Sequence, residues 1–313
     1  MLRKPVTVWA LADGRPGHWN QVCGLVDALS RRVLVKDIAI TAPTRLQSTL
    51  DLFSRRWREA DKLPSPDFII GAGHATHLPM LLARNSRGGR AIVLMKPTFP
   101  TSMFDLCLIP DVQARRSQMN VIATRGALNR MRPDPQRDPD LGMILVGGPS
   151  RHVLWDSQSV IDQIYAVCSQ AGDMHWTITT SRRTPDRLLR GVREMGLLNV
   201  TVVDGRTTES GWLPSMLCKA SAAWVSIDSV SMVYEALTAG CSVGLIDVLM
   251  KRDRGKLARN LNGLIERGDV STLSQWRQSG SLQSPKVLFC EADRCADEIV
   301  ARFLPPMASS NAA

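Results

Sequence analysis

The sequence lacks the features that mark several other protein classes. None of its hydrophobic runs approaches the roughly 20 residues that a membrane-spanning helix requires. No apolar segment with a small-residue cleavage site follows Met1, so we expect no secretory signal. Its seven cysteines include no C-x-x-C pair, which favours free core thiols in a reducing cytoplasm over a disulfide framework. Internal repeats and low-complexity segments are also absent. We therefore expect a globular, cytoplasmic protein.

The length and composition of the chain predict two folded domains. It has 313 residues, of which 44% are hydrophobic, enough to bury a substantial core. Positive charge is concentrated in the first part. Residues 1–138 contain 21 Lys/Arg and 11 Asp/Glu, whereas the remainder contains 18 of each. Such a one-sided basic field favours an anionic partner, either nucleic acid or anionic lipid, although solubility alone is an alternative explanation.

A basic segment in the first part favours lipid over nucleic acid. The basic residues of this segment lie close to apolar ones in the sequence: Arg55, Arg56, Arg58 and Lys62 near Leu50, Phe53 and Trp57. A helix with this pattern is typical of membrane interfaces, but it also fits an ordinary surface helix whose apolar side packs on the core. We expect peripheral association with anionic lipid at the inner face of the membrane, and no nucleic-acid partner.

Strand and helix patterns alternate along the chain. Strands are predicted at 6–11, 67–71, 90–95, 106–109, 143–146, 176–179, 200–203, 222–227 and 242–246, and helices at 17–30, 157–169, 185–194, 231–238 and 293–303. Residues 132–140 carry three prolines among charged residues and are interpreted as a linker. The predicted fold is α/β, with two Rossmann-like domains, 1–138 and 139–313, facing a cleft. The last helix is expected to pack back on the first domain.

Unusual residues follow the predicted strands, where ligands bind in open parallel sheets. In the second domain, glycine-rich and hydroxyl-bearing turns are typical of phosphate sites, because free N–H groups at a helix start favour anions. A carboxylate one turn further along could accept hydrogen bonds from ribose. The candidate donor-binding residues are Gly147, Gly148, Pro149, Ser150, Ser181, Arg182, Asp228, Ser229, Ser231, Met232 and Glu235. Plain βα turns with a capped helix are the alternative.

The first domain offers a candidate general base. His18 follows a Gly-rich loop, and imidazole titrates near neutral pH. Asp13 is positioned to orient His18 or to act as the base itself, while a helix-capping or core histidine is the alternative. The candidate acceptor-side loop residues are Gly14, Gly17, Gly73 and His74.

No metal or cofactor is expected. His74 and His77 have a spacing that a metal could use, but no third ligand is evident, so a structural role is favoured. The segment around Gly73 lacks the third glycine of a dinucleotide fingerprint. Asp138 and Asp140 imitate a metal-binding D-x-D but fall in the predicted linker.

Six segments together resemble the bacterial relatives of the plant mitochondrial-fission protein called Elm, for elongated mitochondria. They are Asp13–His18 with Gln21, Phe104–Pro110, Gly126–Leu128, Gly147–Ser150, Thr179–Thr184 and Asp228–Ala236. The resemblance implies a glycosyltransferase-B fold, distantly similar to lipid A disaccharide synthase and to the lipid-linked GlcNAc transferase of peptidoglycan synthesis. It also implies donor binding in the second domain and acceptor binding in the first.

These observations predict a glycosyltransferase that uses a nucleotide-diphosphate sugar, with a lipid-linked acceptor or anionic lipid as a further partner. A nucleotide-sugar epimerase and a non-catalytic membrane-associated protein are the alternatives. The sugar, the nucleotide, the acceptor and the oligomeric state stay open.

Overall fold

The computed structural model describes residues 4–43, 62–110, 118–170, 173–209, 211–252, 255–284 and 288–304. Contacts divide the chain into two units, Met1–Arg130 with Cys290–Ala313, and Met131–Phe289. The boundary therefore follows Arg130, whereas the proline-rich composition had placed it after residue 138. The basic segment around Arg55–Arg58 lies outside the described residues. Within the described ranges, no helix combines the length and the apolar character needed to span a bilayer.

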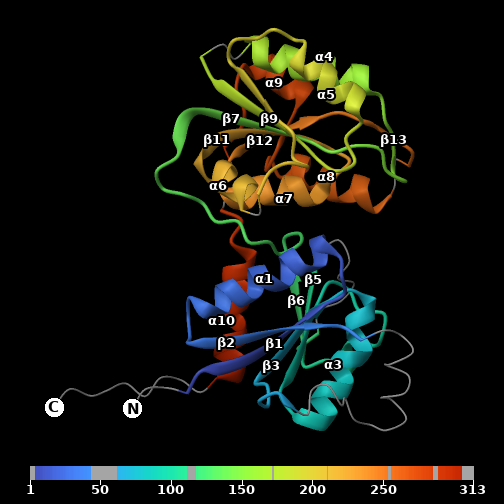
Figure 1. Ribbon diagram of the computed structural model, residues 1–313, viewed down its shortest axis with the longest axis vertical. Helices are drawn as coiled ribbons and strands as arrows, with labels where there is room; N and C mark the ends of the chain where they lie inside the picture. The colour runs from blue at the N-terminus through green and yellow to red at the C-terminus, as the bar shows by residue number, and fades with distance from the viewer. Residues whose placement is uncertain are drawn as a thin grey trace, which may run out of the picture. The chain divides into compact units, whose positions relative to one another are not determined.

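The first unit is a parallel sheet with the strand order β2-β1-β3-β4-β5-β6 (Figure 1). Its strands are β1 (Val6–Ala12), β2 (Val35–Thr41), β3 (Phe68–Ala72), β4 (Arg90–Leu94), β5 (Leu106–Pro110) and β6 (Val121–Thr124). Its helices are α1 (Pro16–Ser30), α3 (His74–Arg87), the short η2 (Thr101–Met103) and α10 (Glu291–Phe303).

Both faces of this sheet are buried, which explains its continuous apolar strands. In β1, Val8 and Ala10 pack in the cluster that contains residues of α1 and α10. Trp9 and Leu11 point the other way, into the cluster that contains residues of α3. This alternation follows from the two-residue period of a strand.

The last helix belongs to the first unit. The guanidinium groups of Arg31 and Arg32, at the end of α1, donate hydrogen bonds to the Asp293 carboxylate at 2.8 and 2.7 Å. Cys295 and Ile299 of α10 are fully buried in the same core as α1. The final segment therefore completes one face of the first sheet.

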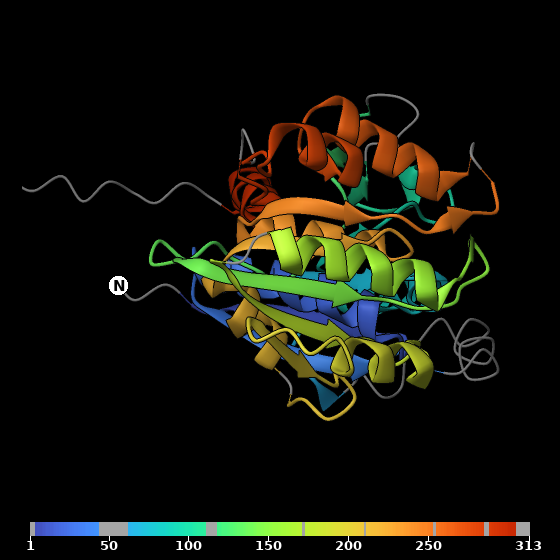
Figure 2. The same ribbon diagram turned by 90° about the horizontal axis from the view of Figure 1, so that it is seen from above.

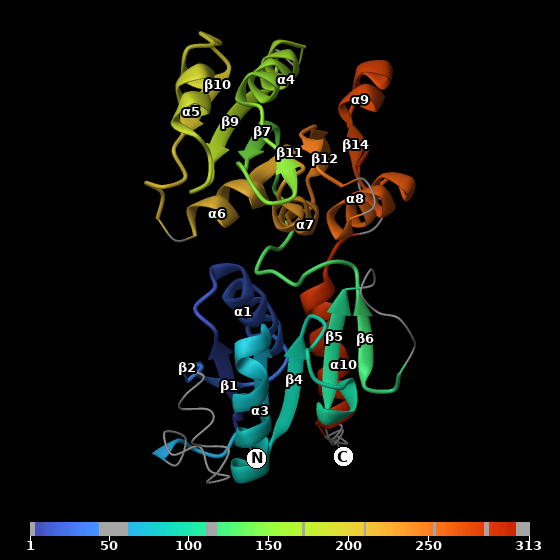
Figure 3. The ribbon, with the colours of Figure 1, turned by 90° about the vertical axis from the view of Figure 1, so that its right-hand side faces the viewer.

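The second unit repeats the architecture with the order β10-β9-β7-β11-β12-β14, which can be followed as a row in Figure 3. The strands are β7 (Asp138–Val146), β9 (His175–Thr180), β10 (Val200–Val203), β11 (Ala220–Ser226), β12 (Ser242–Ile246) and β14 (Ser271–Thr272). Helices α4 (Ser157–Gln170), α5 (Asp186–Arg193) and α9 (Leu273–Ser279) cover one face, and α6 (Trp212–Lys219), α7 (Val230–Ala239) and α8 (Lys256–Glu266) cover the other (Figures 1 and 3). The common direction of β7 and its neighbours is visible in Figure 2.

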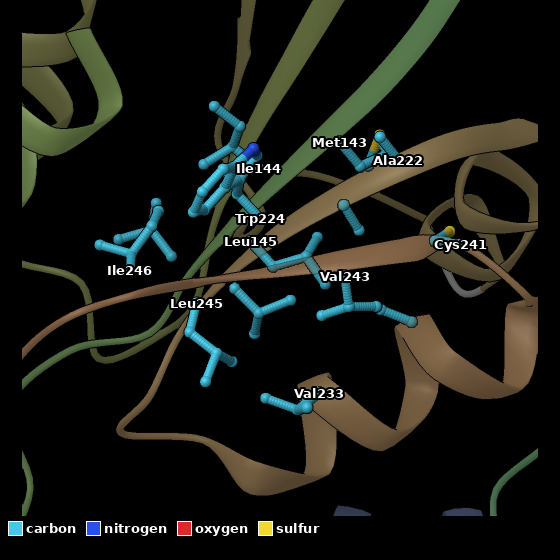
Figure 4. Packing of buried hydrophobic residues seen from close by; sticks show 14 of the residues in the cluster. Met143, Ile144, Leu145, Ala222, Trp224, Val233, Cys241, Val243, Leu245 and Ile246 are labelled. Atoms are coloured by element: carbon cyan, nitrogen blue, oxygen red, sulfur yellow. The ribbon is translucent and has the colours of Figure 1, made fainter. Parts of the chain in front are cut away.

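The core of this unit is built around tightly packed β11 and β12. Trp224 on β11 is buried and lies edge-on to Trp276 at a centroid distance of 5.2 Å. A Cβ on the neighbouring Gly244 would lie 2.5 Å from the Trp224 ring, so glycine makes room for the indole. On the α7 side, Val233 belongs to the same buried cluster as Val243 of β12 (Figure 4).

One sequence interpretation of this region is wrong. Asp138, Pro139 and Asp140 were assigned to a linker, but they form the first residues of β7, and Asp138 pairs with Ala220 of β11. Proline is tolerated there because it stands at the exposed start of the strand, where a missing N–H donor costs little.

Candidate functional site

Asp13 and His18 form a hydrogen-bonded pair at the carboxyl end of β1. The Nδ1 atom of His18 lies 2.7 Å from Oδ2 of Asp13, whose side chain is only 2% exposed, against 19% for His18. The backbone N–H of Arg15 donates to the other carboxylate oxygen at 3.1 Å. Because an ionised carboxylate only accepts, Nδ1 must carry the proton, which leaves the lone pair of a neutral ring on Nε2. The pair is therefore arranged for proton abstraction at Nε2.

Gly73 is the glycine that the pair requires. Its φ is +89°, and a Cβ there would lie 2.4 Å from both Oδ2 of Asp13 and Nδ1 of His18. A side chain at this position would collide with both partners, in a backbone conformation that favours glycine. Gly14 and Gly17 are different: they are exposed, and a Cβ on either would meet no atom within 4 Å among the described residues. The structure thus brings three of the predicted residues of the first domain together.

His74 was predicted in a loop, but it is the first residue of α3, and His77 follows it in the first turn. His74 is exposed, whereas His77 is 2% exposed and its Nδ1 lies 3.0 Å from the Thr98 hydroxyl. Burial, with a smaller contribution from His74, lowers the pKa of His77 to about 4. Hence His77 is a neutral core residue near pH 7. In the described part of the chain, no three His, Cys, Asp or Glu side chains form a group that could hold a metal.

In the second unit, Asp228 connects three loops at the carboxyl edge of the sheet. Its side chain is fully buried. It accepts hydrogen bonds from the Gly148 N–H at 3.1 Å, the Ser226 hydroxyl at 2.7 Å and the Arg183 guanidinium at 2.8 Å. Sequence reasoning counted Asp228 among the donor contacts. In the structure this carboxylate accepts hydrogen bonds from neighbouring residues and holds the loops that follow β7 and β9, while its contact with a donor stays a prediction.

The predicted glycines after β7 are required by this internal packing. A Cβ on Gly147 would lie 2.2 Å from Oδ2 of Asp228, and one on Gly148 would lie 2.2 Å from the carbonyl oxygen of Arg183. Internal packing alone is therefore enough to explain why both positions are glycine. Pro149 and Ser150 extend from this point, and the Ser150 hydroxyl accepts from the His152 N–H at 3.2 Å.

The turn after β9 contains one paired and one unpaired arginine. Arg183 donates to Asp228 and to the carbonyl oxygen of Gly148. Arg182 is exposed, and no described residue forms an ion pair or hydrogen bond with its side chain. The N–H of Ser181 donates to the buried Thr184 hydroxyl at 2.8 Å. Thr184 was not predicted as a site residue, although it closes the Thr179–Thr184 segment and a threonine at the end of such a turn is a recognisable signal.

Helix α7 begins at this same edge, directly after β11. Its cap residue Ser229 makes no side-chain capping bond, and Ser231 is exposed in the first turn. The N–H groups of Met232 and Val233 donate to the Ser229 carbonyl oxygen. In the described structure the N–H groups of Val230 and Ser231 have no acceptor, as expected of a first turn. This terminus can receive an anion.

Glu235 lies one turn further along α7 and is half-buried. Burial raises the pKa of its carboxyl from 4.5 to about 7. Between these two values the folded protein keeps a proton that the unfolded chain has lost. The free energy of unfolding therefore falls as the pH rises from about 4.5 to 7, and this contribution is level above that.

Replacing Glu235 by glutamine should remove that pH dependence. We expect Glu235→Gln to be more stable than the wild type at pH 8, by up to about 3 kcal/mol, and nearly equal to it at pH 4.5. Urea unfolding at both pH values measures the difference. A variant that is less stable than the wild type at pH 8 would show that ionised Glu235 stabilises the fold.

Comparison with known proteins identifies the family of this chain. The sequence profile described as mitochondrial fission ELM1 matches residues 16–303. The chain belongs to the mitochondrial fission ELM1 family. No curated protein matches the sequence significantly.

Solved structures that resemble this ELM1-family chain have glycosyltransferase-B folds. A candidate UDP-N-acetylglucosamine 2-epimerase from Listeria monocytogenes has a TM-score of 0.63 at 12% identity, covering 96% of this chain and 97% of that one. MurG from Acinetobacter baumannii has a TM-score of 0.55 at 14% identity, covering 96% and 99%. A UDP-GlcNAc 2-epimerase from Neisseria meningitidis, bound to UDP-GlcNAc, has 0.51 at 10%, covering 96% and 100%. At such identities the likeness establishes the fold.

Proposed function

We propose that this protein transfers a sugar from a nucleotide-diphosphate sugar to an acceptor hydroxyl, with His18 as the general base. The observation that carries the proposal is the Asp13–His18 pair. A buried carboxylate fixes the ring through Nδ1, and a partly exposed ring presents Nε2. General bases of enzymes that act on hydroxyl groups are commonly built in this way.

The chemistry needs no further protein nucleophile. Nε2 of His18 takes the proton of the acceptor hydroxyl while the acceptor oxygen bonds to the anomeric carbon. The bond from that carbon to the diphosphate oxygen breaks, and the nucleoside diphosphate leaves with the bonding electrons. Asp13 stabilises the imidazolium that forms, since a carboxylate beside it compensates the new charge.

The second unit supplies groups that suit the donor. The start of α7, with Ser229 and Ser231, offers N–H and O–H donors for the diphosphate. The exposed Arg182, in the loop that follows β9, adds positive charge. Glu235, one turn along, suits the ribose hydroxyls. The epimerase from Neisseria meningitidis binds UDP-GlcNAc on the same fold, which supports a UDP-sugar as the donor.

Donor binding tests the proposal directly. We expect UDP-GlcNAc to bind more tightly as the pH rises from 6 to 8, because ionised Glu235 accepts hydrogen bonds better than the protonated acid. Glu235→Gln should weaken binding about tenfold at pH 8 and remove the pH dependence. Calorimetry measures both effects. The exposed Glu194 of the second unit provides a matched control, Glu194→Gln, that should bind as the wild type does.

The alternatives predict other outcomes. An epimerase would convert UDP-GlcNAc with no acceptor present, and the three-dimensional likeness to 2-epimerases favours it as the second candidate. If the protein alone inverts C2 of the sugar in UDP-GlcNAc, with no acceptor present, the epimerase function replaces the transferase proposal. A protein that binds neither UDP nor UDP-GlcNAc would instead be the non-catalytic membrane-associated protein.

A further inference from the structure

Thr76, to which the sequence analysis gave no role, connects the start of α3 with the Asp13–His18 pair. It lies in the first turn of this helix and is 0% exposed. Its hydroxyl donates to the carbonyl oxygen of Gly73 at 2.8 Å, and its backbone N–H donates to the same oxygen at 3.1 Å. Both donors of Thr76 therefore hold a single carbonyl group.

Gly73 carries this contact on to the pair. A Cβ on Gly73 would lie 2.4 Å from Oδ2 of Asp13 and 2.4 Å from Nδ1 of His18, the two atoms that share the hydrogen bond. The α-carbon of Gly73 therefore packs directly against that hydrogen bond. The Asp13 side chain is only 2% exposed, so little water reaches the carboxylate. A hydrogen bond shielded from water is electrostatically stronger than an exposed one.

The other side of Thr76 is packed against β3. A Cβ on Gly71 would lie 2.9 Å from the Thr76 hydroxyl oxygen and 2.6 Å from the Sδ atom of Met80. Such close packing leaves the Thr76 side chain little freedom to rotate. The next residue, His77, holds the same turn through its contact with Thr98. The hydroxyl of Thr76 thus has a fixed place between β3 and the Gly73 carbonyl.

The backbone of Gly73 needs such a restraint. Its φ of +89° and ψ of 154° belong to a region that glycine enters readily, and glycine also leaves it more readily than any other residue would. Hydrogen bonds to its carbonyl oxygen therefore decide which conformation the turn keeps. Without the Thr76 hydroxyl, the turn can rotate away from the pair and admit water to the Asp13 carboxylate.

We propose that Thr76 is a positioning residue for His18. Its hydroxyl holds Gly73 against the Asp13–His18 hydrogen bond and so keeps the ring in the tautomer whose lone pair lies on Nε2. The effect on turnover rests on the proposed function of His18 as the base, whereas the effect on the ring itself can be measured with no substrate present.

Thr76→Val removes the hydroxyl and keeps a branched side chain of similar shape. In the wild type, nitrogen NMR of neutral His18 should show the proton on Nδ1, in slow exchange with water. In Thr76→Val we expect about fivefold to tenfold faster exchange, the factor that corresponds to one lost hydrogen bond, and signal from the Nε2–H tautomer. Thr76→Ser keeps the hydroxyl and should restore slow exchange. Thr76→Ala lacks it and should behave as the valine variant does.

Thr98→Val provides a matched control. It also removes a threonine hydroxyl next to a histidine of the first turn of α3, but that histidine is His77. We expect the control to change the signals of His77 and to leave those of His18 as in the wild type. Wild-type exchange and tautomer in both Thr76→Val and Thr76→Ala would overturn the proposal. So would an equal change in Thr76→Ser, because the hydroxyl would then not be the group that positions the ring.

Turnover separates the positioning role from the proposed reaction. If His18 is the base, Thr76→Val should lower kcat about tenfold and leave the Kd for UDP-GlcNAc unchanged, and Thr76→Ser should restore kcat. A changed tautomer with unchanged kcat would support the positioning role and contradict the role of His18 as the base. A lower kcat with the wild-type tautomer would overturn the positioning role and leave the base role intact.

Discussion

Replacing His18 by alanine should lower the rate of sugar transfer by about 10²- to 10⁴-fold and leave donor affinity unchanged. In the proposed reaction the ring removes the acceptor proton, so its loss should remove only transition-state stabilisation. The proposed donor groups belong to the second unit, on α7 and the neighbouring loops. The effect should therefore appear in kcat, with little change in the Kd for UDP-GlcNAc.

Release of UDP from UDP-GlcNAc, in the presence of a membrane-lipid extract as the acceptor source, measures this rate. Asp13→Asn should also lower it, because an amide can present its NH₂ to Nδ1 and favour the wrong tautomer. The exposed His175 of the second unit serves as a matched control, since His175→Ala removes an imidazole that is hydrogen-bonded to Thr201 and has no proposed role in the reaction. Near-normal turnover in His18→Ala together with a severe loss in Asp13→Asn would make Asp13 the base.

The helices and strands of the two sheets could largely be predicted from the sequence, because buried parallel strands appear in it as short continuous apolar runs. Val6–Ala12 and Ala220–Ser226 are almost wholly apolar, as strands covered on both faces must be. The predicted α/β class with two parallel sheets is confirmed. Strand β2 was missed, because the edge strand Val35–Thr41 is half exposed and carries Lys36 and Asp37. Helix α3 was missed because a proline, Pro79, lies inside it.

The candidate site could be predicted from the sequence only in part, because its residues contact one another across segments that are distant in the chain. Sequence identified Asp13, His18 and Gly73 as unusual residues after strands. It could not show that Gly73 lies against the Asp13–His18 pair, a contact that spans about 60 residues. The pairing of Asp228 with Arg183 likewise depends on how β9 and β11 lie around β7. The residue types indicated which chemistry each side chain could perform, whereas only the tertiary structure showed which residue each side chain contacts.

A cavity of the second unit that is lined by Arg151, His152, Lys251 and Arg252 shows the same limit. Arg151 and Lys251 are ordinary surface residues in the sequence, and each stands next to another basic group or histidine. Only the pairing of Val153–Leu154 with Leu249–Met250 brings them to one cavity. Two-residue strands carry too little periodicity to be predicted from sequence.

Replacing Asp228 by alanine should destabilise the second unit by about 2 to 4 kcal/mol. The change leaves the buried Gly148 N–H and Ser226 hydroxyl without their acceptor. Arg183 is 43% exposed, so water can solvate part of its freed charge, and the cost stays below that of a fully buried ion pair. Urea unfolding at pH 7 measures the loss.

Two companion variants make the Asp228 result specific. Asp228→Asn keeps one acceptor oxygen and should cost less than the alanine variant. Asp186→Ala, which removes a surface ion pair with Arg206, should cost less than about 1 kcal/mol. Since the fully buried Asp228 holds the Gly147–Ser150 loop, Asp228→Ala should also weaken UDP-GlcNAc binding. A variant with wild-type stability and wild-type donor affinity would show that the loop keeps its conformation without this carboxylate, and that its hydrogen bonds contribute nothing to the site.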